Sequence, residues 1–113
     1  MDQEKGKFAV GIEYDDRIHK DFILRPQIVR DSIEAMENER AQKNNSFLGL
    51  CLLTAQIIKL GDIPQEKITP ELVMQLTDVD FDILVKAKEA LESRLRTFLA
   101  EAGKPEKTGA SAS

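Results

Sequence analysis

The sequence predicts an α+β fold in one small domain, with an N-terminal β-hairpin followed by three to four α-helices. Near the N-terminus, apolar residues alternate with polar ones on both sides of a short polar turn, which is typical of a hairpin. After Pro26 the apolar spacing changes to that of amphipathic helices. A length of 113 residues fits one domain, which we place at 7–102 between a flexible N-terminus, 1–6, and a disordered C-terminal tail, 103–113.

The predicted hairpin consists of two strands joined at Asp15-Asp16. Short Asx side chains favour turns because they hydrogen-bond their own backbone and tolerate positive φ. Gly11 indicates a β-bulge in the first strand, and Pro26 ends the second strand because it donates no backbone hydrogen bond. The apolar residues expected to follow the alternation are Phe8, Val10, Ile12, Tyr14, Ile18, Phe22 and Leu24, with Lys20 as the exception in phase.

Three further segments have clear helix signals. An amphipathic helix is expected over about 28–40, with Val29, Ile33 and Met36 on its apolar side. The sequence Thr69-Pro70-Glu71 begins a short helix, because Thr is a good N-cap and Pro suits the first helical position. Thr77 or Asp78 caps the last helix, which runs over about 79–102 and carries an apolar stripe. The stripe consists of Leu84, Ala87, Leu91, Leu95 and Phe98.

A middle helix, predicted over about 47–60 between Ser46 and Gly61, is apolar on nearly every side. A helix of this kind must be buried on every side, and so small a domain covers only part of it. We therefore expect Leu48, Leu52 and Ala55 to be left for a partner chain, because an exposed apolar patch usually marks an interface.

No pattern of nucleophile and base recommends an enzyme. His19 is the only histidine; it lies out of phase with the apolar residues of its strand and is expected to face solvent without a catalytic partner. Cys51 is the only cysteine, and its place among leucines fits a core residue better than a reactive thiol. One cysteine and one histidine cannot form a zinc site.

The acidic residues Asp78, Asp80, Asp82 and Glu89 have the spacing of a calcium-binding loop. That loop needs glycine at its sixth position, where this chain has the β-branched Ile83. An acidic first turn that complements the helix dipole explains the aspartates without a ligand. The sequence therefore predicts neither a metal nor another cofactor.

Charge is distributed unevenly along a chain with 16 basic and 20 acidic residues and a net charge of −4. Residues 17–30 are net positive, whereas residues 60–85 are net negative. Segments of opposite sign suit complementary docking between chains, and two ordinary solvated faces explain them equally well. The candidate partner contacts in these segments are Arg25, Arg30, Asp78 and Asp80.

Composition also bears on partners and compartment. Nucleic-acid binding is not expected because basic residues do not predominate, and a third, less favoured hypothesis would place it on Arg17, Lys20, Arg25 and Arg30. A single cysteine fits a reducing compartment, and the N-terminus shows no secretion signal. The longest uncharged stretch, 44–58, is too short to cross a bilayer, so no membrane partner is expected.

Three segments of the chain resemble the Mu-like tail assembly chaperones of contractile-tailed bacteriophages. Residues 21–26, DFILRP, followed by 29–35, VRDSIEA, are similar to that family's strand of type LxLRxP and helix of type xVxDxxxAE. Residues 76–84, LTDVDFDIL, look like its LDLxDFxxL segment. The resemblance covers about residues 8–99, and the leucine-rich stretch 47–58 departs from it.

What the resemblance implies is a non-enzymatic assembly factor in the cytoplasm of an infected bacterium, absent from the mature virion. Such a protein coats the tape measure protein, a long and largely helical chain, keeps it soluble and recruits tail tube protein subunits. The apolar helix offers a compatible mode, in which one helix face covers an apolar stripe of the client. The same helix suits a homo-oligomer, so a small homodimeric adaptor or regulatory protein associating through 47–58 is the alternative.

Overall fold

The computed structural model describes residues 2–102, which are built around a three-stranded antiparallel sheet of order β1-β2-β3. The strands are β1 (Glu4–Tyr14), β2 (Arg17–Leu24) and β3 (Ile57–Leu60). The helices are α1 (Val29–Met36), α2 (Glu39–Lys43), α3 (Asn45–Ala55), the 3-10 turn η1 (Gln65–Lys67), α4 (Pro70–Val73) and α5 (Asp78–Ala102). The predicted tail, 103–113, lies outside the described residues.

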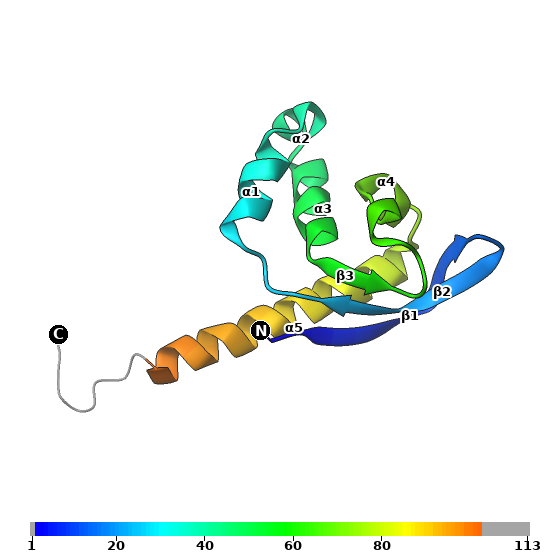
Figure 1. Ribbon diagram of the computed structural model, residues 1–113. Coiled ribbons are helices and arrows are strands. Elements are labelled where there is room, and N and C mark those ends of the chain that lie inside the picture. Colours follow the sequence, from blue (N-terminus) through cyan, green and yellow to red (C-terminus); the bar gives the residue numbers. More distant parts are fainter. Residues whose placement is uncertain (1, 103–113) are drawn as a thin grey trace, which may run out of the picture.

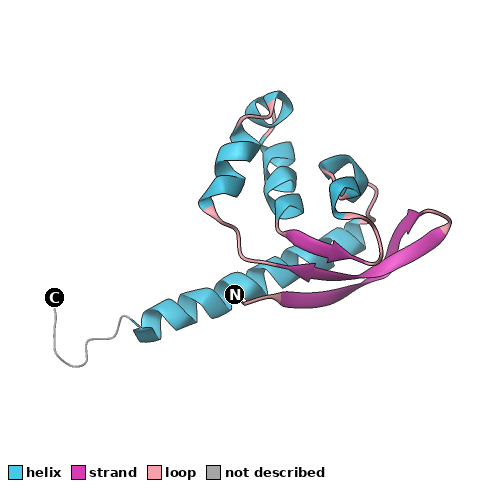
Figure 2. Cartoon of the chain, in the orientation of Figure 1, coloured by secondary structure: helices cyan, strands magenta, loops and turns pink. Residues whose placement is uncertain are grey.

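The arrangement confirms the predicted α+β class and adds a third strand to the hairpin. Figure 1 shows α1, α3 and α4 gathered above the sheet, while α5, which packs against β1, passes behind the strands and continues to the lower left of the view. Figure 2 shows the same arrangement coloured by secondary structure. The apolar core therefore lies where the sheet meets α3, α4 and α5, and its buried members are Phe8, Ile12, Phe22, Leu24, Leu53, Ile57, Leu60, Ile63, Ile68, Leu72, Val73, Leu84 and Leu91.

The hairpin turn has the conformation that its residues predict. Asp15 and Asp16 have φ values of 55° and 62°, the left-handed pair required by the commonest two-residue hairpin turn. β1 begins at Glu4, three residues before the predicted start of the domain at residue 7. The early start is held by Arg94 of α5, whose guanidinium donates to the carboxylates of Asp2 at 3.0 Å and Glu4 at 2.6 Å.

A β-bulge interrupts the hairpin where Gly11 predicts one. Between Lys7 and Ile12, β1 advances five residues while β2 advances only two, from Asp21 to His19. Gly11 has a φ of 93°, and a Cβ at this position would lie 2.7 Å from the carbonyl oxygen of His19. Both the backbone angle and the close approach require glycine.

The bulge overturns part of the predicted alternation, because its extra residues change the side of the sheet that later residues face. Val10 and Ile18, expected on the buried side, are 54% and 55% exposed. The prediction that His19 faces solvent is wrong, since only 5% of it is exposed. Its Nδ1 accepts the backbone N–H of Asp62, and its Nε2 therefore carries the proton and donates to the carbonyl of Tyr14, both at 3.1 Å.

Two helix starts in the middle of the chain differ from the prediction. The helix expected over 28–40 is split into α1 and α2, because the Asn38 side chain accepts the N–H of Ala41 at 3.0 Å and caps a new helix. Residues 41–46, predicted as a polar link between two helices, are divided between the end of α2, Asn44 and the start of α3. Asn44, rather than the predicted Ser46, caps α3 by accepting the N–H groups of Ser46 and Phe47.

The end of the predicted middle helix is a strand. α3 ends at Ala55, and residues 57–60 form β3 instead of a last helical turn. Gln56 makes this change of direction: its carbonyl accepts the Arg25 N–H and its side-chain amide donates to the Arg25 carbonyl, both at 2.9 Å. This pairing with the residue that follows β2 aligns the next residues with the edge of β2. Gly61, predicted to close the helix, ends β3 with a φ of 54°.

The predicted starts of α4 and α5 are confirmed. The Thr69 hydroxyl accepts the N–H of Leu72 at 3.2 Å, and Pro70 occupies the first helical position of α4. The Thr77 hydroxyl accepts the N–H of Asp80 at 3.1 Å at the start of α5. Of the two caps considered for the last helix, Thr77 is the one that makes the bond.

Candidate functional site

An ion pair between the end of β2 and the first turn of α1 fixes the orientation of α1. The Arg25 guanidinium donates to both carboxylate oxygens of Asp31, at 2.8 and 2.9 Å, and Asp31 also accepts the Ile28 backbone N–H at 2.9 Å. Asp31 is only 4% exposed. The hydrogen bonds from Arg25 lower the pKa of Asp31 by more than its burial raises it. The carboxylate is therefore ionised at neutral pH and holds its side of α1 against the body of the domain.

The apolar side of α1 consequently faces solvent, which reverses the expected orientation of this amphipathic helix. Val29, Ile33 and Met36 are 77%, 54% and 60% exposed, and we call these three residues the α1 stripe. The buried residues of α1 are Asp31 and Ala35, on the side that packs against α3. The sequence does not predict this exposed surface, because the periodicity gives the apolar side of a helix but not the side that meets the core.

α3 is covered more fully than its composition predicts. α1, α2, α4 and β3 all pack against it. Leu48, Leu52 and Ala55, the expected partner contacts, are half-buried. Among the described residues, none of the large apolar side chains that are mostly exposed belongs to α3. The helix is also less apolar than predicted, because Ile57 and Ile58 belong to β3 rather than to α3.

Asp80, another expected partner contact, is a buried anchor. One carboxylate oxygen accepts the N–H of Ala9 at 2.6 Å, and the other accepts those of Val10 and Gly11 at 3.0 and 2.8 Å. Burial alone would raise the pKa of Asp80, but the three backbone donors, with Lys20 nearby, outweigh it and lower the pKa. With no exposed surface, Asp80 offers nothing to a partner and instead joins α5 to the bulge of β1.

The two segments of opposite charge meet within the chain. Arg17 of the basic segment lies 3.5 Å from Asp62 of the acidic one, in an exposed ion pair. Arg25 is occupied by the pair described above. Arg30 and Asp78 are exposed and belong to none of the ion pairs found within residues 2–102. Of the four charged residues expected to contact a partner, these two are therefore the ones at the surface.

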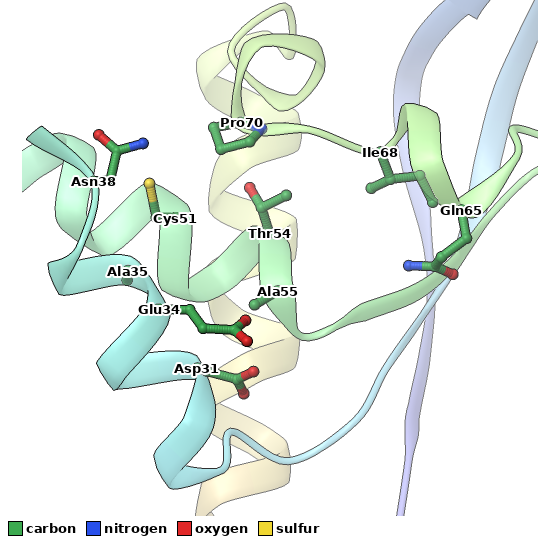
Figure 3. Close-up of a pocket in the computed structure, with 10 residues that line it drawn as sticks. All are labelled: Asp31, Glu34, Ala35, Asn38, Cys51, Thr54, Ala55, Gln65, Ile68 and Pro70. Carbon is green, nitrogen blue, oxygen red and sulfur yellow. The ribbon is translucent and has the colours of Figure 1, made fainter. Parts of the chain in front are cut away.

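A cleft of about 320 Å³ lies beside the α1 stripe, between α1, α3 and the segment from η1 to α4 (Figure 3). It is lined by Asp31, Glu34, Ala35, Asn38, Cys51, Thr54, Ala55, Gln65, Ile68 and Pro70. Burial, with Glu71 nearby, raises the pKa of the Cys51 thiol. The thiol form is a poor nucleophile, and no histidine lines the cleft, so the arrangement suits binding better than covalent catalysis.

The C-terminal end of α5 is a second apolar surface. After Arg94, which binds the start of β1, the helix continues past the sheet (Figure 1). Phe98 and Leu99 are 67% and 65% exposed, whereas Leu91 on the same helix is fully buried. The apolar side of α5 that packs on the sheet thus continues past the end of the sheet.

Two classes of site find no support in the part of the chain that the structure describes. Across residues 2–102, no helix combines the length and apolar character that crossing a membrane requires. Nor do three or more His, Cys, Asp or Glu side chains in that range come together in a way that could hold a metal ion. Asp78, Asp80 and Asp82, which have calcium-loop spacing, lie in the first turns of α5.

Comparison with known proteins adds no relative: no protein-family model, curated protein or solved structure matches the chain. The residues that carry the resemblance to tail assembly chaperones nevertheless have clear structural places. Arg25 and Asp31, from the strand and helix segments, pair with each other and orient α1. Asp80, from the third segment, holds the bulge. These contacts give the three residues structural roles in this chain, and the pair on α1 leaves the α1 stripe at the surface.

Proposed function

We propose that this protein is a non-enzymatic chaperone of phage tail assembly that binds the tape measure protein through the α1 stripe. The observation that carries the proposal is the outward orientation of Val29, Ile33 and Met36 on a helix whose other side is fixed by a buried ion pair. An apolar stripe that faces solvent contributes little to folding, and such exposed apolar surface usually marks an interaction site.

The geometry fits a helical client. Val29, Ile33 and Met36 are spaced by four and three residues, so they form a ridge along one side of α1 that can pack into the groove of another helix. A largely helical tape measure protein exposes apolar stripes until the tail tube encloses it. Covering those stripes would keep the client soluble.

A short ridge also suits reversible binding. Three exposed side chains bury little area, so each contact is weak and the client can be released when the tube assembles. Many copies along one long client would supply the total affinity. Recruitment of tail tube protein would then use surfaces that the client leaves free. This activity belongs in the cytoplasm of the bacterial host.

A second candidate, a small homodimeric adaptor, is favoured by one specific observation. The end of α5 carries Phe98 and Leu99 beyond the sheet, and two copies could cover these side chains by pairing their helices. We place the homodimer contact here rather than on the middle helix, because Leu48, Leu52 and Ala55 of α3 are half-buried whereas Phe98 and Leu99 are mostly exposed. The substitution Phe98→Asp separates the candidates, since it removes self-association under the second and leaves client binding intact under the first.

We expect Ile33→Asp to abolish solubilisation of the tape measure protein without unfolding the chain. Ile33 is 54% exposed, so the substitution changes the free energy of unfolding by no more than about 0.5 kcal/mol, whereas a carboxylate on the ridge cannot be buried against an apolar helix. The measurement is co-expression with a candidate tape measure protein, followed by comparison of the soluble and insoluble fractions.

Met74→Asp provides the matched control, because Met74 is similarly exposed, at 50%, but follows α4 and lies outside the α1 stripe. It is expected to solubilise the client as well as the unmodified chain does. Full solubilisation and copurification with a folded Ile33→Asp variant would overturn the proposal.

A further inference from the structure

The cleft beside the α1 stripe has the shape and lining of a pocket for a long amphipathic side chain. Ala35, Ala55, Ile68 and Pro70 give it apolar walls, and its polar groups come from α1, α3 and η1. Figure 3 shows the Asp31 and Glu34 side chains extending from α1 to the same side, with Ile68 and Gln65 across the cleft. Glu34 directly follows Ile33 of the α1 stripe, so the cleft is within reach of a helix lying on that stripe.

The charge of the cleft is one-sided. Its lining includes two carboxylates, Asp31 and Glu34, and no lysine, arginine or histidine. Arg25 already neutralises Asp31 through two hydrogen bonds. Glu34 takes part in none of the ion pairs of residues 2–102, and its side chain is exposed at the rim. One carboxylate in the cleft is thus left for a cation from outside.

A buried hydroxyl among the residues that line the cleft lacks a hydrogen-bond partner. Thr54 is only 6% exposed, and its Oγ1 forms no hydrogen bond with any group of residues 2–102. In Figure 3 this hydroxyl is directed into the space between Cys51 and Pro70, which both line the cleft. A buried hydroxyl without a partner costs free energy, which a donor arriving from a ligand would recover.

We propose that the cleft binds a cationic side chain, arginine or lysine, of the helical partner that lies on the α1 stripe. The methylene stem would pack between Ala35 and Ala55, and the cationic head would donate to the Glu34 carboxylate and to Thr54 Oγ1. This inference rests on the proposed function for the identity of the partner. The apolar ridge alone does not distinguish one amphipathic helix from another. A cationic residue of the client that enters the cleft would determine which segment of the client binds.

The test uses single side-chain analogues, so it does not depend on having the client. Backbone amide spectra of the full chain are recorded during titration with N-acetyl-argininamide, N-acetyl-lysinamide and, as the neutral isostere of arginine, N-acetyl-citrullinamide. We expect saturable shifts at Glu34, Thr54 and Ala55 with the two cationic analogues, at millimolar affinity. Citrulline is expected to bind about fivefold more weakly or not at all, because it keeps the shape and loses the charge.

Two variants and one control make the result specific. Glu34→Gln is expected to weaken binding of the arginine analogue about fivefold, and Thr54→Val is expected to weaken it about twofold. Glu37→Gln, at the C-cap of α1 and outside the cleft, is expected to leave it unchanged. Equal binding of citrulline, an unchanged affinity in Glu34→Gln or no saturable shift at the cleft would each refute the inference.

The outcome is separate from that of the proposed function. Ile33→Asp lies on the stripe rather than in the cleft, so it is expected to leave the analogue titration unchanged while removing client solubilisation. Binding of the cationic analogues without any client binding by the stripe would sink the proposed function alone. Client solubilisation by a chain that shows no cationic preference would sink this inference alone.

Discussion

Replacing Asp80 by alanine is expected to lower the free energy of unfolding by about 3 to 5 kcal/mol, because three backbone N–H groups lose one shared charged acceptor. Ala9, Val10 and Gly11 sit in a bulge that has no strand partner to replace the carboxylate. Domains of this size are stable by only about 5 to 15 kcal/mol, so the variant loses a large part of its stability. Urea unfolding followed by circular dichroism at pH 7 measures the loss.

The acid sensitivity of the chain gives a second readout for Asp80. Its pKa is lowered in the folded chain, so the stabilisation is fully present above the unfolded pKa of about 3.9 and is lost as pH falls through the lower folded value. The unmodified chain should therefore lose stability below about pH 4, and Asp80→Ala should lose less over the same range.

Asp82→Ala is the matched control for Asp80→Ala. Asp82 lies two residues away on α5, is exposed, and forms only a 3.8 Å pair with Lys86, so its removal should change the free energy of unfolding by less than about 1 kcal/mol. Equal stabilities of Asp80→Ala and Asp82→Ala, with the same acid response, would show that the carboxylate does not hold the bulge.

Asp31→Ala is expected to lower the free energy of unfolding by about 2 to 3 kcal/mol and to loosen α1 from α3. The substitution removes the cap at Ile28 and leaves Arg25 without its partner. The loss is smaller than that for a fully buried pair because the Arg25 side chain is 25% exposed. Hydrogen exchange of the α1 amides, measured together with urea unfolding, follows both effects.

A double-mutant cycle with Arg25→Met isolates the pair. Because each single substitution breaks the same two hydrogen bonds, the two losses should overlap strongly in the double variant. Losses that simply add would show that the pair does not orient α1. The pKa of Asp31 is lowered, chiefly by Arg25, so this contribution is also lost as pH falls below about 4. Glu37→Ala, at the exposed end of α1, should affect neither stability nor exchange.

Features set by local chemistry were predictable from the sequence. The turn at Asp15-Asp16, the bulge at Gly11 and the capped start of α4 at Thr69 depend on residues that are neighbours in the chain. Backbone preference and hydrogen bonding within a few residues decide such features. The α+β class followed from the same signals, because the spacing changes once, after Pro26.

Features set by contacts between distant residues were not predictable in the same way. Gly11 predicts a bulge, and a bulge leaves backbone N–H groups without a strand partner. Nothing in the sequence identifies Asp80, about 70 residues later, as the acceptor of those groups. His19 was placed at the surface by simple alternation, which the register shift of the bulge invalidates. Residues 57–60 continued an apolar run that suits a helix or a buried strand, and pairing with β2 decided for the strand.

The candidate site illustrates the same distinction. The sequence predicts more apolar surface on the middle helix than one small domain can cover, because composition is most apolar there. The surplus lies on α1 instead, because the buried pair of Asp31 with Arg25 turns the apolar side of that helix outward. The signal was present in the sequence as an arginine and an aspartate six residues apart on either side of Pro26, but only the structure shows that they meet.

The most direct test of the central claim is oxidation of the methionines, which reports on the α1 stripe through Met36 and contains its own control in Met74. Met36 is 60% exposed and Met74 is 50% exposed, so dilute peroxide should oxidise both at similar rates in the free chain. In the complex with the tape measure protein, peptide mass spectrometry should find Met36 protected several-fold and Met74 unchanged. Equal oxidation of Met36 in the free and bound chain would contradict binding through α1.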